Sequence, residues 1–569
     1  MGKFKLGSLF GSSSSTKTQD ASDKKKEHRK SFAGFASASA FKNKNGGSNG
    51  NGVKPALPAV AETAPTEAQK VNGEQTSRMV ALAKKITNDT EKLEAYMKEH
   101  NLAMPSFDVD SPGDFPKLPE DIKQCREEIK FATKELGLLA QGPRESLRWG
   151  TWDFLEVLAL QMINHFGIAK LFPADATITL AELQTKTKLD AINLARLLRM
   201  AMTNGIFREP SPGVIAHTAA SRLLAEDEAL QAWIGFNCED IFPAAAHVID
   251  AIKTYPEATS LVQTGFCFAF GTVSKEPMFV TFGKDPERAR RMGRAMVSLT
   301  GGEGYEVSYL VDVEGGGYDF SEIDAAGGTL VDIGGSHGFV CVELAARYKR
   351  MKFVVQDLQK TVDSAPKPIC DDPQAAERIT LVAHDFFTEQ VTKDADVYFF
   401  RWIMHNYSTP YAIKILWNLI PALKPGARIL INDHCLGEPG SENAWDESVM
   451  RRMDLVMLAL LNAQERTEAE FRELFKAASP GFVFKGVTRP KGCRMSIVEA
   501  VWQPESLAAE AAVTADAVDE VKVNGDVVGG DAVAVNGAVV NGDAVNETAA
   551  ADESDEVKGD STKGDVDNE

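Results

Sequence analysis

The sequence contains few cysteines, and none of them is spaced to hold a metal ion. Seven are scattered over 569 residues, and no two form a Cys-x-x-Cys pair. Paired cysteines stabilise secreted domains, whereas isolated ones are typical of reducing compartments. We therefore expect reduced thiols, a cytoplasmic protein and no metal site built from cysteine.

Long hydrophobic runs are also absent. No apolar stretch approaches the roughly 20 residues that a membrane-spanning helix needs. The first residues, MGKFKLGSLFGSSSS, contain no apolar core of the kind found in signal peptides. Leu6 occupies the place where a myristoylation motif needs Ser or Thr. We expect no secretion signal and no membrane association.

The chain lacks the basic surface that nucleic-acid binding requires. Its net charge is −19, unevenly distributed. Residues 1–60 carry 11 Lys/Arg and 3 Asp/Glu, a net +8, and residues 503–569 carry 3 Lys and 17 Asp/Glu, a net −14, which leaves −13 for the middle. An acidic middle argues against a nucleic-acid partner.

Both ends have the composition of disordered tails. Residues 1–77 are basic and rich in Ser, Gly and Asn, and they contain KKKEHRK at 24–30. That run is a possible nuclear localisation signal, although a solvated basic tail is the favoured interpretation. Residues 503–569 form an acidic, low-complexity tail that repeats VNG motifs. We predict no stable structure in either tail.

Residues 78–315 have the apolar spacing of helices. Thr179 and Glu182 form the pattern of a capping box at the start of one of them. Two helices at 179–187 and 190–207, followed by a two-stranded wing at 208–218, indicate a winged helix. Such motifs often bind DNA. Because leucines crowd the second helix around Arg196, a packing role is favoured over DNA binding.

From residue 318 onward, short apolar runs alternate with helical stretches. Near-continuous apolar strands that alternate with helices are typical of a mostly parallel sheet covered on both faces. The fold class is therefore α/β, with a Rossmann-like sheet of seven strands. The predicted strands cover 329–334, 352–358, 379–385, 396–403, 427–435, 483–489 and 495–502.

Each of the first five predicted strands ends in a residue suited to ligand binding or catalysis. The carboxyl ends of parallel strands meet at one edge of the sheet, where ligands bind in open α/β folds. A lone acid at a strand end is more often a helix cap, but five strands in series favour a site. The residues, in chain order, are Gly334, Gly335 and Gly338, then Asp357, Asp385, Arg401 with His405, and Asp433.

The glycine loop suggests a nucleoside cofactor without phosphates. Dinucleotide sites usually read G-x-G-x-x-G, whereas this loop has Gly334 and Gly338 with three residues between them and an acid before them. S-adenosylmethionine fits such a site. Asp357 is the candidate for the ribose diol and Asp385 for the adenine amine. Phe386 and Tyr407 are candidates for contacts with the adenine ring.

Four motifs in this order resemble those of one family. They are LVDIGGSHG, RWIMHNYS, ILINDHC and QERTEAEF, and the similarity extends from about 145 to 502. The chain resembles small-molecule O-methyltransferases of the caffeate and isoflavone type, in the fungal branch near sterigmatocystin O-methyltransferase. The resemblance implies S-adenosylmethionine as cofactor, no metal, and a hydroxyl of an aromatic secondary metabolite such as a polyketide as the methyl acceptor.

The resemblance also assigns roles to residues. It implies that His405 is the general base, that Asp433 holds its imidazole, and that Glu465 flanks the ring on the other side. It adds Arg401 to the cofactor contacts and assigns no role to His337 or His434. It implies a helical dimerisation domain over 78–315, a cofactor domain over 316–502, and a homodimer.

The sequence differs from the family pattern at two positions, and two questions of interpretation stay open. Tyr407 and Asn406 stand where relatives usually have Trp and Asp. The segment 265–280 is either a wall of the substrate pocket or plain core, and core is favoured. Some relatives keep the fold as inactive accessory proteins. The glycine loop, Asp357 and His405 favour an enzyme here.

Overall fold

The computed structural model describes residues 76–504 of the chain. The predicted tails, 1–77 and 503–569, lie almost entirely outside the described residues. Within residues 76–504, no helix combines the length and apolar character that crossing a membrane would require.

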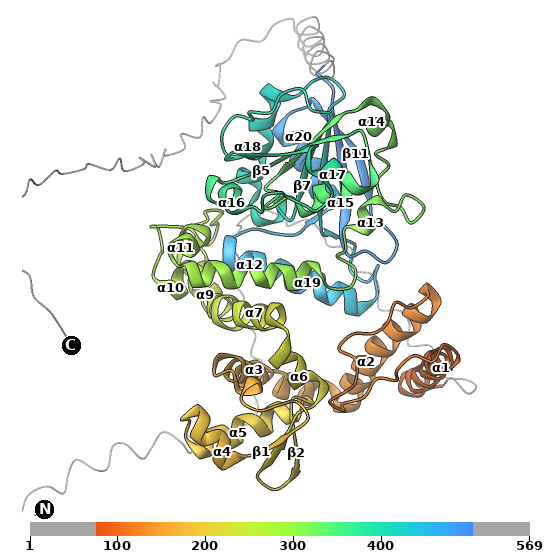
Figure 1. Ribbon diagram of the computed structural model, residues 1–569, viewed down its shortest axis with the longest axis vertical. Helices are drawn as coiled ribbons and strands as arrows, with labels where there is room; N and C mark the ends of the chain where they lie inside the picture. Colours follow the sequence, from red (N-terminus) through yellow and green to blue (C-terminus); the bar gives the residue numbers. More distant parts are fainter. Residues whose placement is uncertain (1–75, 505–569) are drawn as a thin grey trace, which may run out of the picture. The chain divides into compact units, whose positions relative to one another are not determined.

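The amino-terminal part is mainly helical, as the apolar spacing predicts (Figure 1). Its helices are α1 (Arg78–Glu99), α2 (Glu120–Gly150), α3 (Phe154–His165), η1 (Ile168–Lys170), α4 (Leu180–Thr187), α5 (Ala191–Met202), α6 (Ala219–Glu226), α7 (Glu228–Phe236), η2 (Asn237–Ile241), α8 (Phe242–Ala246), α9 (Val248–Thr254), α10 (Gly265–Phe270), α11 (Met278–Lys284), α12 (Pro286–Thr300), α13 (Ser308–Val311) and α14 (Ser321–Ala326).

A small antiparallel sheet accompanies α4 and α5. Its strands are β1 (Thr177–Thr179), β2 (Arg208–Ser211) and β3 (Val214–Ala216), in the order β1-β3-β2. The predicted two-stranded wing is thus joined by a third strand. The capping box of Thr179 and Glu182 is present at the start of α4. On α5, Leu194 and Leu198 are fully buried while Arg199 forms an exposed ion pair with Glu209.

The carboxy-terminal part contains the predicted seven-stranded sheet, in the order β11-β12-β8-β7-β4-β5-β6. All seven predicted strands are confirmed, and β12 alone runs antiparallel to its neighbours. The strands are β4 (Thr329–Ile333), β5 (Lys352–Asp357), β6 (Ile379–Ala383), β7 (Val397–Arg401), β8 (Arg428–Asp433), β11 (Phe482–Thr488) and β12 (Ser496–Trp502).

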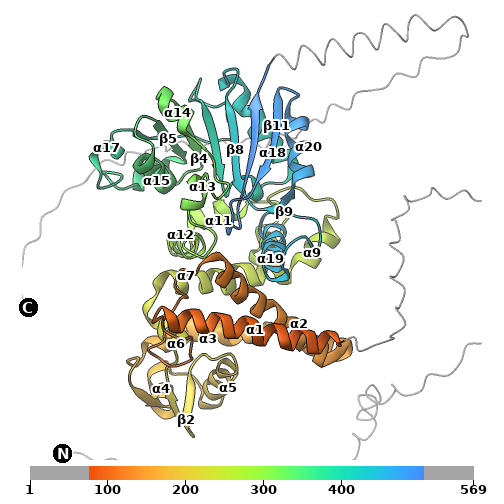
Figure 2. The same ribbon diagram turned by 90° about the vertical axis from the view of Figure 1, so that its right-hand side faces the viewer.

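Helices cover both faces of this sheet, and each face has its own apolar core. Figure 2 shows α18 and α20 on one side and α14 and α15 on the other. These helices, with the shorter segments between them, are α15 (Phe339–Arg347), α16 (Gln359–Ser364), α17 (Pro373–Ala376), η3 (Met404–Asn406), α18 (Thr409–Leu419), η4 (Ile420–Ala422), β9 (Cys435–Leu436), α19 (Ala444–Leu461), β10 (Arg466–Thr467) and α20 (Glu468–Ala478).

The central strands are buried on both faces, which explains their continuous apolar sequence. In β7, Tyr398 and Phe400 pack into the core beneath α18 and α20, whereas Phe399 packs into the core beneath α15. Alternate side chains of a strand point to opposite faces, so a doubly covered strand is apolar at every position. The parallel register of β4, β5, β7 and β8 brings their carboxyl ends to one edge.

Phe399 provides a direct test of this arrangement. Replacing Phe399 with Ala is expected to lower the free energy of unfolding by about 3–5 kcal/mol, because the ring is fully buried and leaves a cavity. Chemical denaturation followed by circular dichroism measures the change. The matched control, Ile249→Ala on exposed α9, should change it by less than about 0.5 kcal/mol. Equal effects of the two substitutions would contradict the assigned core.

Candidate active site

The glycine loop between β4 and α15 is packed too tightly to accept side chains. Gly334 and Gly338 have positive φ angles of 74° and 77°, which favour glycine. A Cβ atom at Gly334 would lie 2.5 Å from Cδ1 of Ile403, and one at Gly335 would lie 2.5 Å from Oδ2 of Asp332. The loop therefore presents bare backbone at the edge of the sheet.

Asp357 is fixed beside this loop. It ends β5, and its carboxylate accepts the backbone N–H groups of Ser336, at 2.9 Å, and Leu358, at 2.8 Å. Asp332, at the end of β4, is buried behind the loop, and burial raises the pKa of its carboxyl to about 7. Asp332 thus belongs to the wall of the site, whereas Asp357 stands at its surface.

Asp385 and Phe386 follow β6 at the same edge. One carboxylate oxygen of Asp385 accepts the backbone N–H of Phe387 at 2.9 Å. The ring of Phe386 lies edge-on to that of Tyr407, with 5.7 Å between centroids. Tyr407 itself is buried, and burial raises the pKa of its hydroxyl above the usual range.

These residues fit a nucleoside cofactor such as S-adenosylmethionine. The three glycines of the loop have no side chains that would obstruct a ligand, two carboxylates stand at neighbouring strand ends, and an aromatic ring follows one of them. The chemistry and the positions both fit. Asp357 would bind the ribose, Asp385 the adenine amine, and Phe386 would provide apolar contact for the adenine ring. The cofactor contacts of Gly334, Gly335, Gly338, Asp357, Asp385, Phe386 and Tyr407 stay predictions.

Arg401 is positioned differently from the other candidates, since its guanidinium is committed to protein groups. It is buried at the end of β7, where it donates to the side-chain oxygen of Asn432 and, at 2.5 Å, to the carbonyl of Tyr305. The pKa of Arg401 is lowered by burial. Its predicted contact with the cofactor remains a prediction.

His405 lies in the short turn η3 between β7 and α18 and is only 6% exposed. Its ring Nδ1 lies 2.8 Å from Oε1 of Glu465. Its backbone N–H donates to Oδ2 of Asp433 at 3.0 Å. Asp433 ends β8, next to β7, and its carboxylate accepts a hydrogen bond from the backbone of the turn. Its predicted role of holding the imidazole stays a prediction. Glu465 alone of the two hydrogen-bonds to the ring.

The His405–Glu465 pair has strongly perturbed electrostatics. Burial favours the neutral form of Glu465, yet the neighbouring His405 holds the pKa of this carboxyl at about 2. Burial also opposes protonation of His405, but the Glu465 carboxylate, with a smaller contribution from Asp433, raises the pKa of the imidazole above its ordinary value. A carboxylate at Nδ1 favours the tautomer with its proton there and leaves Nε2 free to accept one.

Arg466 fixes the turn that carries His405, a role that was not predicted from the sequence. Its fully buried guanidinium donates to the carbonyls of Met404, at 2.8 Å, and Tyr407, at 2.7 Å. Burial lowers the pKa of Arg466. The QERT motif therefore contributes two residues: Glu465 contacts the ring of His405 and Arg466 holds its backbone.

Three aromatic side chains that were assigned no role from the sequence form one group, and one of them, Trp402, contacts His405. Trp402 adopts a positive φ of 57°, and its ring centroid lies 5.1 Å from that of His405. The rings of Tyr305 and His434 lie 5.5 Å and 5.1 Å from Trp402. Burial raises the pKa of Tyr305 to about 12, so its phenol stays protonated at neutral pH.

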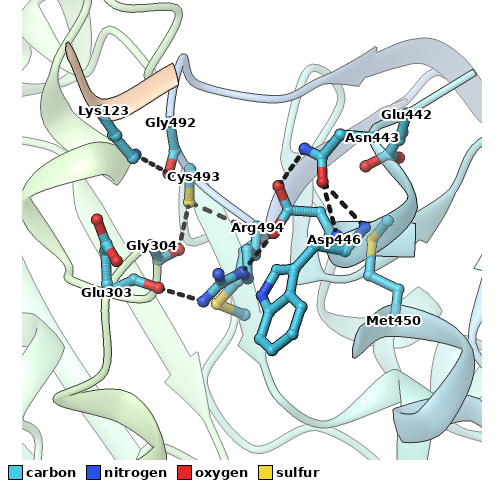
Figure 3. Close-up of polar contacts among 12 residues, drawn as sticks. Lys123, Glu303, Gly304, Glu442, Asn443, Asp446, Met450, Gly492, Cys493 and Arg494 are labelled. Atoms are coloured by element: carbon cyan, nitrogen blue, oxygen red, sulfur yellow. Dashed lines mark hydrogen bonds and ion pairs between the residues drawn. The ribbon is translucent and has the colours of Figure 1, made fainter. Parts of the chain in front are cut away.

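A polar cavity of about 330 Å³ lies on the other side of Tyr305. Residues from α2, α19 and the loop 489–494 line it, and Figure 3 shows their contacts. Arg494 donates to Asp446 at 3.1 Å and to the carbonyl of Glu303 at 2.6 Å, and its guanidinium lies 5.6 Å from the Tyr305 ring. Arg494 thereby connects the cavity wall to the aromatic group beside His405.

Part of the segment 265–280 is core, while Phe279 and Val280 are 37% and 39% exposed. Phe266 and Met278 are buried, and they pack in one apolar cluster with Met457 of α19. This agrees with the favoured interpretation of the sequence. His337, in the glycine loop, is exposed and contacts the hydroxyl of Ser364 at 3.0 Å.

Comparisons with known proteins show which family this chain is similar to. A family model described as the O-methyltransferase domain matches residues 268–483. The chain is 60% identical over 433 residues to a chlorophenol O-methyltransferase of Trichoderma longibrachiatum, covering 76% of this chain and 92% of that protein. It is 36% identical over 444 residues to the O-methyltransferase AMT9 of Alternaria alternata, covering 76% and 99%.

Solved structures share the fold. The crystal structure of LaPhzM is 29% identical, with a TM-score of 0.52, and covers 63% of this chain and 100% of its own. The crystal structure of OxaC in complex with sinefungin and meleagrin is 23% identical, with a TM-score of 0.57, and covers 74% and 99%. At that identity the second match supports the fold alone.

The chain belongs to the S-adenosylmethionine-dependent O-methyltransferases. The predictions of family, enzyme class and cofactor are thereby confirmed, and the alternative of an inactive accessory protein is not supported.

Gly335 offers a test of the cofactor loop. Gly335→Ala would place a Cβ 2.5 Å from the Asp332 carboxylate and 3.0 Å from Val355, so the loop must shift. We expect calorimetric binding of S-adenosylhomocysteine to weaken by about tenfold or more, equivalent to ~1.4 kcal/mol. Gly283→Ala in α11 is the control, because a Cβ there meets nothing within 4 Å. Unchanged affinity in Gly335→Ala would show that the cofactor does not use this loop.

Proposed function

We propose that the enzyme methylates the hydroxyl of a small phenol, with His405 as general base. The observation that carries this proposal is the buried contact of 2.8 Å between His405 and Glu465 at the sheet edge that bears the glycine loop. The 60% identity to a chlorophenol O-methyltransferase supports a phenolic acceptor, and chlorinated phenols are the first substrates to test. The other O-methyltransferases among the relatives come from fungi, which agrees with an aromatic secondary metabolite.

His405 would remove the proton that makes the phenol a poor nucleophile. A free phenol has a pKa of about 10 and an imidazole one of about 6.5, so proton transfer has to accompany attack. Nε2 of His405 is the free nitrogen, because Nδ1 faces Glu465. A positioned base of this kind contributes roughly 10²–10⁴ in rate. When bound, S-adenosylmethionine supplies an electrophilic methyl group on a sulfonium centre.

Glu465 and Asp433 would serve His405 in different ways. Glu465 stabilises the imidazolium that forms when His405 accepts the proton, as the acid of a catalytic triad does. Asp433 fixes the backbone of the turn, and with it the place of the imidazole. Positioning of reacting groups is worth up to ~7–11 kcal/mol in ideal cases, so both contacts matter to the rate.

The proposed base is tested by separating binding from chemistry. We expect His405→Ala to lower kcat with a chlorinated phenol by about 10²–10⁴ while calorimetric binding of S-adenosylhomocysteine stays unchanged. Asp357→Ala is the complementary variant and should lose the cofactor instead. Full activity of a folded His405→Ala variant would exclude the general-base role. Failure of the wild-type enzyme to methylate any phenol would overturn the substrate class.

We also propose that the enzyme is a homodimer that associates through α2 and α3. Large apolar side chains are exposed along these helices, including Leu147 at 75% and Trp152 at 58%. Monomeric proteins rarely expose apolar groups so densely. The others on this surface are Leu138, Leu139, Trp149, Phe154, Leu155, Val157 and Leu158.

The dimer surface is tested by introducing charge. Leu147→Glu combined with Trp152→Glu should convert the protein from dimer to monomer in light scattering coupled to size-exclusion chromatography, since burying two carboxylates is costly. Ile192→Glu, at an exposed apolar position on α5, is the control and should stay dimeric. A wild-type monomer at all concentrations, or a double variant that remains dimeric, would contradict this interface.

A further inference from the structure

His434 is buried beside the proposed base without a hydrogen-bonding partner. It follows β8 directly and is 0% exposed. Neither ring nitrogen has a hydrogen-bond partner among the described residues. Buried polar groups in native proteins are almost always satisfied, and each exception calls for an explanation. The mechanism proposed above gives His434 no task.

The local strand pairing brings His434 to Glu465. β9 and β10 pair in parallel, with Arg466 opposite Cys435, so the preceding residues, Glu465 and His434, are neighbours. Nδ1 of His434 lies 3.6 Å from Oε1 of Glu465, the same oxygen that contacts His405 at 2.8 Å. A separation of 3.6 Å is too long for a hydrogen bond but short for an electrostatic interaction in a buried site.

Packing alone does not account for a histidine at this position. The ring lies between Tyr305 and Trp402, at centroid distances of 5.8 Å and 5.1 Å. An apolar side chain would fill the same space without leaving buried polar atoms unpaired, which is unfavourable. The position next to Glu465 therefore points to a role for the imidazole nitrogen.

We propose that His434 is a positioning residue, a second histidine on the Glu465 carboxylate that shares its charge with His405 and thereby sets the pH at which His405 accepts the substrate's proton. This inference rests on the proposed function of His405 as general base. His434 touches neither the proton nor the methyl group. It acts through the carboxylate that the two imidazoles have in common.

Other charged groups near the pair are fixed by contacts of their own. Asp433 is bound to the His405 backbone, and Arg466 to the carbonyls of Met404 and Tyr407. On the α19 side, Asp454 accepts the backbone N–H of Glu465 at 2.9 Å. None of these contacts involves the side chain of His434. Burial opposes the low pKa of Glu465, His405 makes the larger contribution that lowers it, and His434 makes a smaller one.

The sign of the effect follows from the shared oxygen. An N–H of His434 near Oε1 draws part of the carboxylate's charge away from His405, and a protonated His434 would repel the His405 imidazolium. Removing it leaves the full charge of Glu465 on His405 and stabilises the imidazolium. The pKa of His405 then rises, and since the base acts when neutral, the acid limb of kcat/KM moves to higher pH.

Paired variants of the full-length enzyme test this. His434→Leu and His434→Phe remove the N–H but keep an apolar side chain between Tyr305 and Trp402. His434→Asn keeps an N–H donor close to the place of Nδ1. We expect the acid limb measured with a chlorinated phenol to move up by about 0.5–1 pH unit in the first two variants and to stay in place in His434→Asn. His247→Leu, on the exposed surface, is the control.

Heteronuclear NMR of the His405 ring provides a readout without substrate. Its titration, assigned by comparison with a His405→Gln variant, should show the same upward shift in His434→Leu and His434→Phe. An unmoved His405 titration in whichever of these variants folds, or an equal movement in His434→Asn, would overturn the role of His434. If the wild-type enzyme methylates no phenol, the proposed function fails, whereas the titration still decides the proposal for His434.

Discussion

The site depends on one buried carboxylate, that of Glu465. An ionised carboxyl group away from water is unstable unless cations or hydrogen-bond donors compensate it. Here the compensation comes from His405, whose Nδ1 lies 2.8 Å from Oε1 of Glu465, and from His434, whose Nδ1 lies 3.6 Å from the same oxygen. The same compensation gives His405 its high proton affinity and its orientation. A buried carboxylate would destabilise an ordinary core, but here the carboxylate of Glu465 makes His405 a better base.

The turn that carries His405 is held from several directions. Asp433 binds its backbone N–H from β8, and Arg466 binds two of its carbonyls from β10. Both partners are themselves buried. Backbone contacts of this kind restrict where the imidazole is, whereas Glu465 restricts how it is turned. The family motifs around residues 401–408, 433 and 464–471 thus describe one structural unit made from three separate segments.

Much of the fold could be predicted from the sequence, because apolar periodicity and capping patterns are local signals. The seven strands and the capping box of Thr179 follow from such patterns. The motifs also placed His405 and Glu465 together. The contact of Asp433 with the backbone of the turn could not be predicted, since a strand indicates which residues reach an edge but not which atoms their side chains meet. The place of His434 beside Glu465 could not be predicted either, because the pairing of β9 with β10 involves only two residues on each strand, too few for a periodic signal.

The predicted cofactor residues and Glu465, the partner of His405, lie in different parts of the sequence. The predicted cofactor residues between Gly334 and Tyr407 lie on the first four strands of the sheet and the turn after them. Glu465, by contrast, lies 60 positions after His405, beyond α19. A substitution in the segment that contains Glu465 can therefore abolish proton transfer and leave the predicted cofactor residues unchanged. In this fold, a single substitution near Glu465 could therefore convert an enzyme into a protein that still binds the cofactor but no longer transfers its methyl group.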